Sequence, residues 1–169
     1  MGSRSAPDDS VGSAPVTVPA RDADAGDFGK FYERELAGQV RRATLIVGDR
    51  QAARDLVHDS FADVFQRWTQ VREPGPYLNI VVLNRCRDHL RRNKRRSRAE
   101  YRPILNDHAD DESLWDALHA LPFNHRAALA LRFHEQMTDR EIAETLGCRI
   151  GSVGPWIRRG LTKLRMDLS

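Results

Sequence analysis

Apolar residues spaced three and four positions apart predict three helices between residues 27 and 97. The first stripe is Leu36, Val40, Ala43 and Val47, and the second is Ala53, Leu56, Val57, Phe61, Val64, Phe65 and Trp68. Gly48 is expected to end the first helix, and Asp49 to cap the second. A break at residues 74–76 precedes a third helix that starts at about Pro76. Its inward residues are expected to be Tyr77, Ile80, Val81, Leu83 or Asn84, and Leu90.

A second helical unit is expected over residues 112–169. Leu114, Trp115, Leu118 and Leu121 form a stripe that stops at Pro122, and further helices are expected at 127–133, 138–146 and about 152–167. No strand pattern is found. The predicted fold class is all-α, with two small helical domains (27–97 and 112–169) joined by a flexible acidic linker (98–111). Residues 1–26 have almost no large apolar residue and are expected to be a disordered tail.

The segment 138–153 is typical of a helix-turn-helix. Thr138 and Glu141 have the spacing of a capping box, and Gly147 permits a left-handed turn. Ile142, Ala143 and Leu146 are expected to face inward, and Ile150 and Val153 to fill the angle between the two helices. In such a motif the second helix enters the major groove of DNA. The alternative is an ordinary helical hairpin.

Composition narrows the class of protein. Hydrophobic residues make up 40% of the 169 residues and charged residues 30%, and no apolar run approaches the roughly 18 residues of a membrane helix. No signal peptide is recognised, so we expect a soluble, cytoplasmic protein without membrane insertion. The six histidines lack metal-ligand spacing, and Cys86 and Cys148 cannot form a zinc site, so no metal or cofactor is expected. Both cysteines are interpreted as small buried or half-buried residues.

Charge is strongly segregated along the chain. The net charge is only +3, but residues 85–98 contain eight Lys and Arg against one Asp. Residues 99–112 follow with five Asp and Glu against one Arg. A basic segment of this density indicates a polyanion such as nucleic acid. The alternative is a solvated helix end.

These motifs together resemble the extracytoplasmic-function (ECF) group of bacterial RNA polymerase sigma factors. Residues 121–133, with the helix-turn-helix, resemble the fourth domain of that family. Residues 54–68 resemble the polymerase-binding helix of its second domain, and Tyr77-Leu78 with 84–92 resemble the promoter-melting helix. The resemblance covers about 28–97 and 112–166. It implies that residues 27–97 are sigma domain 2 and residues 112–169 are sigma domain 4.

The resemblance implies roles for two sets of residues in the N-terminal domain. The candidates for binding core polymerase are Asp55, His58, Asp59, Asp63 and Gln66. Paired carboxylates also fit a metal or acid-base site, but no third ligand or nucleophile is placed nearby. The candidates for the −10 element are Tyr77, Asn79, Asn84, Arg85, Arg87, Asp88, Arg91, Arg92, Lys94 and Arg95. Tyr77 is equally well a core aromatic, and Asn84 with Asp88 is equally well a hydrogen-bonded pair within the domain.

A third set is implied for the −35 element. Its members are Arg140, Ser152, Gly154, Pro155, Trp156, Arg158, Arg159 and Lys163. The family usually has Gly-Thr-Val-Lys-Ser-Arg where this chain has residues 151–156, so a lysine and an arginine are missing. Pro155 fits only if the last helix starts at about Ser152, which would place Pro155 in the first turn. Trp156 is a candidate for contact with the DNA backbone or a thymine methyl group.

The predicted function is that of a sigma factor, not an enzyme. It would bind core polymerase (the beta-prime and beta subunits), direct it to promoter DNA, and help to open the −10 region. An anti-sigma factor is a further partner that the family often has. The alternative is a stand-alone helix-turn-helix regulator. An enzyme acting on nucleic acid is disfavoured, because the sequence offers no catalytic cluster.

Overall fold

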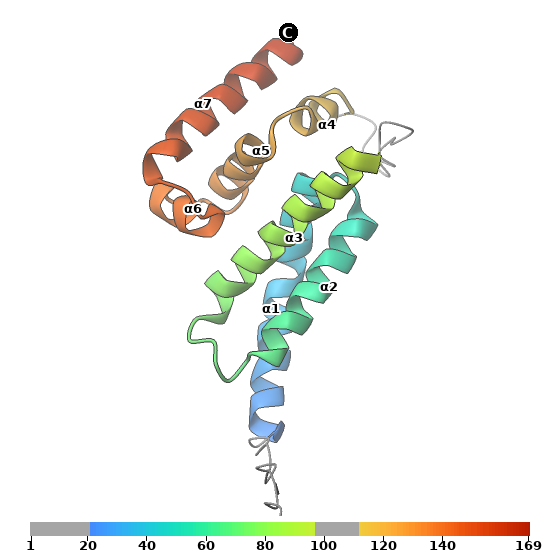
Figure 1. Ribbon diagram of the computed structural model, residues 1–169, viewed down its shortest axis with the longest axis vertical. Coiled ribbons are helices and arrows are strands. Elements are labelled where there is room, and N and C mark those ends of the chain that lie inside the picture. Colours follow the sequence, from blue (N-terminus) through green and yellow to red (C-terminus); the bar gives the residue numbers. More distant parts are fainter. Residues whose placement is uncertain (1–20, 97–111) are drawn as a thin grey trace, which may run out of the picture.

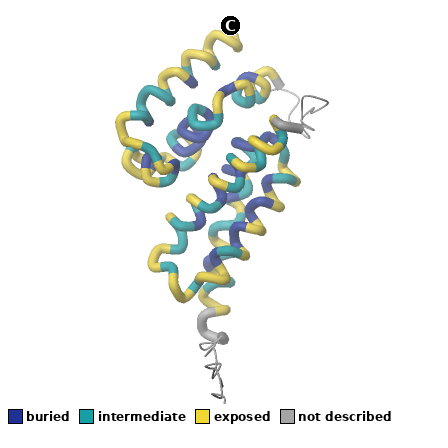
Figure 2. Tube along the Cα trace, in the orientation of Figure 1, coloured by how far each residue is buried: buried dark blue, intermediate teal, exposed yellow. Residues whose placement is uncertain are grey.

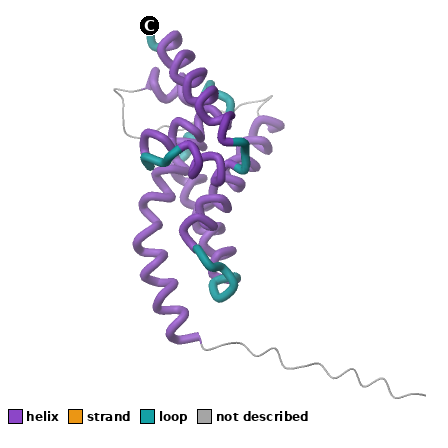
Figure 3. The backbone as a smooth tube through the Cα atoms, turned by 90° about the vertical axis from the view of Figure 1, so that its left-hand side faces the viewer, coloured by secondary structure: helices purple, strands orange, loops and turns teal. Residues whose placement is uncertain are grey.

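The computed structural model describes the backbone of residues 21–96 and 112–169, which consists of helices joined by turns (Figures 1 and 3). The helices are α1 (Arg21–Val47), α2 (Arg50–Gln66), α3 (Pro74–Arg96), α4 (Glu112–His119), α5 (Phe123–Leu129), η1 (Ala130–His134), α6 (Asp139–Leu146) and α7 (Ile150–Asp167). This confirms the all-α fold class. Among these helices none is long and apolar enough to cross a membrane.

Helices α1, α2 and α3 form an N-terminal bundle, which we call the N-terminal unit (Figure 1). Gly48 has φ +84°, and the Asp49 side chain accepts a hydrogen bond from Ala52 N at 2.8 Å, so both predicted helix ends are confirmed. Helix α1 starts at Arg21, so residues 21–26 are helical where we expected a tail. Helix α3 starts at Pro74, because a proline in the first turn needs no N–H donor.

Helices α4 to α7, with η1, form the C-terminal unit. The capping box between Thr138 and Glu141 and the left-handed Gly147 (φ +65°) are both present, as predicted. Helix α5 starts directly after Pro122, four residues earlier than expected. It continues into η1, a wider π-helical turn.

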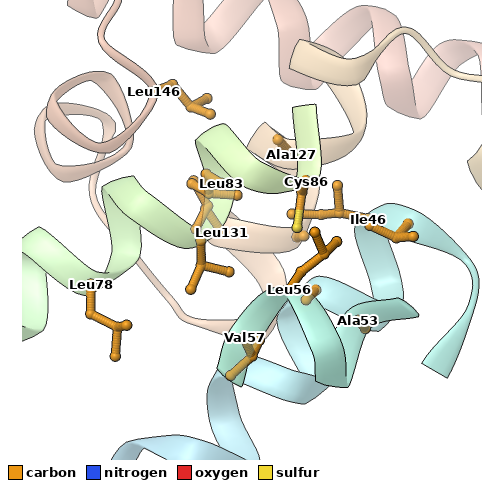
Figure 4. Packing of buried hydrophobic residues seen from close by; sticks show 14 of the residues in the cluster. Ile46, Ala53, Leu56, Val57, Leu78, Leu83, Cys86, Ala127, Leu131 and Leu146 are labelled. Carbon is orange, nitrogen blue, oxygen red and sulfur yellow. The ribbon is translucent and has the colours of Figure 1, made fainter. Parts of the chain in front are cut away.

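The two units pack against each other through a shared core. Buried residues of α1, α2 and α3, among them Ile46, Leu83 and Cys86, lie beside Ala127 and Leu131 of the C-terminal unit (Figures 2 and 4). Each of these five side chains is fully buried. The expected acidic linker, residues 98–111, lies outside the described residues, as does the tail up to residue 20.

Candidate functional site

The five residues predicted to bind polymerase lie on α2. Asp55, His58, Asp59 and Gln66 are exposed, and Asp63 is half-exposed. The opposite face of α2 is buried against α1 and α3, so these side chains point away from the core. The structure therefore brings this set together on one accessible helix face.

Contacts link this acidic face to its neighbours. The Arg85 guanidinium of α3 donates to Asp63 at 2.5 Å and lies 4.0 Å from Asp59. His58 Nε2 is 3.1 Å from the Tyr32 hydroxyl of α1. Arg85 was predicted to contact DNA, but here it is an ion-pair partner of the polymerase-binding candidates.

An aromatic groove beside the acidic face was missed by the sequence analysis. It is lined by Phe28, Tyr32, His58, Phe61, Ala62 and Phe65. Phe65 was expected in the core, but 52% of its surface is exposed. The apolar stripe of α2 was wider than one buried face requires, which is the signal that could have identified Phe65.

Helix α3 carries a basic, exposed face. Of the candidates for the −10 element, Asn84, Asp88, Arg91, Arg92 and Lys94 are exposed. The last three have no carboxylate within ion-pair distance among the described residues, so their positive charge faces solvent. The side chain of Arg95 lies outside the described part of the chain.

Two other −10 candidates, Asn79 and Tyr77, make contacts within the N-terminal unit. Asn79 Oδ1 accepts hydrogen bonds from Gln39 Nε2 at 2.7 Å and from Arg42 Nη1 at 2.6 Å. The Tyr77 hydroxyl accepts from Arg67 Nη1 at 2.9 Å, and its ring is packed against the core.

Arg87 is held by the C-terminal unit. Its guanidinium lies 4.8 Å from the ring centroid of Phe123 and donates to the Leu146 carbonyl at 3.5 Å. In this arrangement Arg87 therefore contacts the helix-turn-helix unit.

A buried ion pair joins the two units. Arg42 of α1 is only 3% exposed, and its Nη2 lies 2.9 Å from Oε2 of Glu135, which follows η1. Burial opposes ionisation of Glu135, but the hydrogen bond and charge of Arg42, together with His134, hold its pKa below the usual value. Glu135 is therefore a carboxylate at neutral pH, and it neutralises Arg42 across the interface.

Arg126 makes a second buried link between the units. Its guanidinium donates to the Ile46 carbonyl of α1 at 2.5 Å, and to the carbonyls of His119 and Leu121 at 2.9 and 3.0 Å. Burial lowers the pKa of Arg126 to about 10, so it remains charged at neutral pH. No sequence pattern indicated this role.

The −35 candidates lie on α6 and α7. Arg140, Arg158, Arg159 and Lys163 are exposed, whereas Ser152, Gly154, Pro155 and Trp156 are half-buried. Trp156 packs against the core. Lys163 is paired with Asp167 at 2.9 Å.

The start of α7 differs from the prediction in two ways. Ser152 N donates to the Arg149 carbonyl at 2.9 Å, so the helix starts at Ile150 and Pro155 is its sixth residue, beyond the first turn. The expectation that Pro155 lies in the first turn is therefore wrong. Ile150 was expected to be buried, but it is 54% exposed.

The cysteines follow the sequence interpretation. Cys86 is buried and Cys148 is half-buried. Burial raises the pKa of the Cys86 thiol to about 12, so it is protonated at neutral pH. Among residues 21–96 and 112–169, no group of three or more His, Cys, Asp or Glu is placed to hold a metal ion.

Comparison with known proteins identifies the family. Residues 31–96 match the family description "Sigma-70 region 2", and residues 111–164 match "Sigma-70, region 4". The chain belongs to the sigma-70 family of RNA polymerase sigma factors. Its relatives place it in the ECF group, as its sequence resemblance predicted.

Three curated relatives cover most of the chain. The RNA polymerase sigma-E factors of Streptomyces coelicolor and Streptomyces antibioticus are 28% and 30% identical over 84% of this chain, and over 86% and 84% of their own lengths. The ECF RNA polymerase sigma factor SigE of Mycolicibacterium smegmatis is 28% identical over 94% of this chain and 68% of its own length.

Two solved structures share the fold. The sigma factor RpoE of Bartonella quintana, in complex with the anti-sigma factor NepR, has a TM-score of 0.73 at 19% identity, covering 84% of this chain and 96% of that chain. CnrH, in complex with the cytosolic domain of CnrY, has a TM-score of 0.64 at 22% identity, covering 86% and 92%.

Proposed function

We propose that this sigma factor binds core RNA polymerase through α2, contacts the −10 element through α3, and contacts the −35 element through α7. The observation that carries the proposal is the arrangement of three exposed surfaces. An acidic face on α2, a basic face on α3 and a capped helix-turn-helix lie in one chain of the sigma-70 family. The chain itself would catalyse no reaction, and it would act in the cytoplasm, where the polymerase works.

The polymerase contact combines charge with apolar surface. Asp55, Asp59 and His58 supply polar groups, and the adjoining groove exposes Phe65. Exposed charge pairs contribute little affinity, typically less than about 1 kcal/mol each. A buried aromatic anchor contributes more to most interfaces. We infer that Phe65 provides the apolar centre of this contact and that the carboxylates provide its orientation.

The main part of the promoter contact on α3 is the attraction between its basic side chains and DNA phosphates. Arg91, Arg92 and Lys94 would lie against phosphates, which gives an affinity that falls steeply with salt. Asn84 and Asp88 lie on the same exposed face and are available to base edges. Asn79 is engaged with Arg42, so a role for it at the −10 element requires this hydrogen bond to break.

The closed arrangement of the two units must open on a promoter. Positions −10 and −35 differ by about 25 base pairs, which at about 3.4 Å per base pair is about 85 Å of duplex. In the closed form Arg87 of α3 touches Phe123 and the Leu146 carbonyl, so the two DNA surfaces are much closer together than this. Residues 97–111 join the units, and a chain of this length spans up to about 50 Å when extended. Separation of the units would also release Arg87 for DNA.

Run-off transcription with purified core polymerase tests the proposal. The chain should redirect initiation to a defined set of promoters. The double variant Asp55→Arg/Asp59→Arg should weaken binding to core by at least tenfold, because it reverses charge on the contact face. Helicity by circular dichroism should be unchanged, since both side chains are exposed. Arg34→Glu/Glu35→Arg on α1, where Arg34 is exposed and Glu35 half-exposed, is the control for a charge swap outside α2.

The outcome separates this proposal from the alternative regulator. Normal assembly of the Asp55→Arg/Asp59→Arg variant would contradict the α2 contact. Tight duplex binding by the chain alone, without any binding to core, would favour a stand-alone regulator. One of the two structural relatives was solved with an anti-sigma factor, and a partner of that class is a further candidate for this chain.

A further inference from the structure

The His119 ring of α4 lies against the N-terminal unit at Gly48. Gly48 has no side chain, and a Cβ added there would lie 2.6 Å from His119 Nε2, 2.9 Å from Cδ2 and 3.0 Å from Cε1. The edge of the ring that carries Nε2 therefore rests on the backbone between α1 and α2. The ring also stacks on Trp115, with the two planes 9° apart and 5.4 Å between centroids, so it is held in this position.

The hydrogen bonding of His119 shows which ring nitrogen carries the proton. Nδ1 lies 2.8 Å from the Trp115 carbonyl oxygen, which can only accept, so Nδ1 is the donor of the neutral ring. Nε2 is then the unprotonated nitrogen. It is buried and has no hydrogen-bond partner among the described residues. A proton added at Nε2 would therefore create a buried, charged N–H donor without an acceptor, which is costly.

The charged groups around the ring also oppose that proton. Arg126 of α5 donates to the His119 carbonyl at 2.9 Å and is itself buried, so its positive charge is poorly screened. Asp116 of α4 favours the proton, but it is exposed. Asp49, in the turn that the ring touches, has its carboxylate engaged as the cap of α2. Burial, and then the charge of Arg126, hold the pKa of His119 below its usual value.

We propose that His119 is a proton-sensitive contact, which holds the two units closed when it is neutral and releases them when it is protonated. Separation of the units brings water to Nε2, and water supplies the missing acceptor. Proton uptake therefore favours the open arrangement, and opening in turn favours proton uptake. The closed arrangement alone carries this proposal, which is independent of the proposed contacts with polymerase and promoter.

His134 is a second histidine beside the interface, and its proton acts in a different way. Its Nδ1 is 3.1 Å from Oε1 of Glu135, whose other oxygen is paired with Arg42 across the interface. A proton on His134 therefore adds an attractive partner to this carboxylate and does not oppose the closed form. The release by acid is thus assigned to His119.

Reactivity of the Cys86 thiol measures the opening. Cys86 is fully buried in the core that both units share, so it should react with an aromatic disulfide reagent only after the units separate or the chain unfolds. The full chain with Cys148→Ser leaves one thiol to follow. Dividing the rate by that of the urea-unfolded chain at the same pH gives the open fraction. A weak dependence of this fraction on urea identifies separation of the units, because unfolding exposes much more surface.

The open fraction should rise about five- to tenfold between pH 7.5 and pH 5.5. In the open form a histidine with an ordinary pKa of about 6.5 takes up its proton over this range. His119→Gln, which cannot titrate, should reduce the rise to less than twofold. His134→Gln and His125→Gln are the matched controls and should keep it; His125 lies between α5 and α7, within the C-terminal unit. An equal rise in His119→Gln and the wild type would overturn the proposal.

Proton NMR of the wild-type chain tests the same contact without a substitution. The ring protons of His119 should titrate with a pKa below 6.5, and a pKa at or above 6.5 would overturn the proposal even if His119→Gln failed to fold. Both measurements are made on the free chain. Failure of the chain to direct initiation would contradict the proposed function and leave this test unchanged.

Discussion

Gly48 is a residue at which the N-terminal unit closely approaches the C-terminal unit. It has φ +84°, and a Cβ there would lie 2.6 Å from Nε2 of His119 in α4. The His119 ring is not free to withdraw, because its Nδ1 is 2.8 Å from the Trp115 carbonyl and the ring stacks on Trp115. One glycine therefore serves both as a helix end and as a contact between units.

Gly48→Ala should be more destabilising than Gly147→Ala. Both add a side chain at positive φ, which costs about 1–2 kcal/mol. Only the alanine at 48 also collides with a neighbour, since a Cβ at Gly147 meets nothing within 4 Å. Urea unfolding of the two variants gives the comparison. Equal losses in the free energy of unfolding would show that His119 does not press on residue 48.

For individual residues the sequence predicted the helix caps better than the boundary of the core. The caps at Asp49 and Thr138 were predictable because they depend on neighbours within three residues. The exposure of Phe65 and Ile150 was not, because an apolar residue at the edge of a stripe fits either side of the core boundary. The engagement of Asn79 with Arg42 was also hidden, because the two are 37 positions apart.

Helix α3 combines a buried face with a basic one. Leu78, Val82, Leu83 and Cys86 are fully buried, whereas Arg91 and Arg92 extend beyond the core into solvent. The end of α3 is therefore a cationic surface that continues from a part of the helix anchored in the core.

Arg91→Ala with Arg92→Ala should lower open-complex formation and flatten its salt dependence. Two lost phosphate contacts should change the slope of log affinity against log salt by about 2. The measurement is promoter opening by permanganate footprinting at several salt concentrations. Arg50→Ala with Arg54→Ala, on exposed positions of α2, is the control. An unchanged slope would remove Arg91 and Arg92 from the DNA surface.

Helix α7 shows why boundaries were harder to predict than elements. The spacing of its apolar residues and its basic residues predicted a helix that ends at about Asp167. The preference of proline for the first turn of a helix, used alone, placed the start at about Ser152, two residues too late. The start is set by the turn after Gly147 and by the Ser152–Arg149 hydrogen bond. As a result α7 contains an internal proline that cannot donate to the Gly151 carbonyl.

Pro155→Ala should therefore stabilise the protein. Restoring a donor in the helix interior and removing the ring should raise the free energy of unfolding by about 1–3 kcal/mol. Gly154→Ala, which adds helix propensity and leaves the proline in place, should give only about 0.5–1 kcal/mol. Chemical denaturation monitored at 222 nm measures both. A loss of stability in Pro155→Ala would mean that the ring makes contacts that outweigh its cost.

Histidines make the whole molecule sensitive to mild acid. Burial, and then the nearby charge of Arg126, lower the pKa of His119, and burial also lowers the pKa values of His89 and His125. Below about pH 6.5 the unfolded chain therefore takes up protons that the folded chain resists. Stability should be constant above that pH and fall as the pH drops below it.

Unfolding free energies between pH 7.5 and pH 5.5 measure this effect. The window lies above the range in which Glu135 titrates, because the pKa of that carboxyl is below its usual value. His119→Gln should reduce the slope between pH 6.5 and pH 5.5. A stability that rises on acidification would contradict the direction assigned to these histidines.

Packing between the two units was the feature least accessible to sequence reasoning. The helices of both units were predictable from the local spacing of apolar residues. The acidic character of the α2 face and the basic character of the α3 face were predictable as well. The contacts that close the molecule pair residues far apart in the sequence, such as Arg126 with Ile46, which are 80 positions apart, and no periodic signal connects them. Counting charges along the sequence also could not show that Arg42 is buried, because a buried arginine adds to the net charge in the same way as an exposed one.

Removal of the Glu135 carboxylate should open the molecule. Glu135→Ala leaves the Arg42 charge buried with only the neutral acceptors Gln39 and Asn79, which should cost about 2–3 kcal/mol in the closed state. Separation of the units relieves that cost, because Arg42 then reaches water. Small-angle X-ray scattering should show a larger radius of gyration, and binding to a promoter duplex by the free chain should strengthen, because Arg87 is released.

Asp167→Ala is the matched control for this last prediction. It removes the carboxylate of an exposed pair with Lys163 within α7, so it should change the free energy of unfolding by less than about 1 kcal/mol and leave the radius of gyration unchanged. If Glu135→Ala scatters like the wild type, the ion pair does not hold the units together. The closed state would then depend on the shared apolar core and Arg126, and Ala127→Glu would be the variant that opens it, since Ala127 is fully buried in that core.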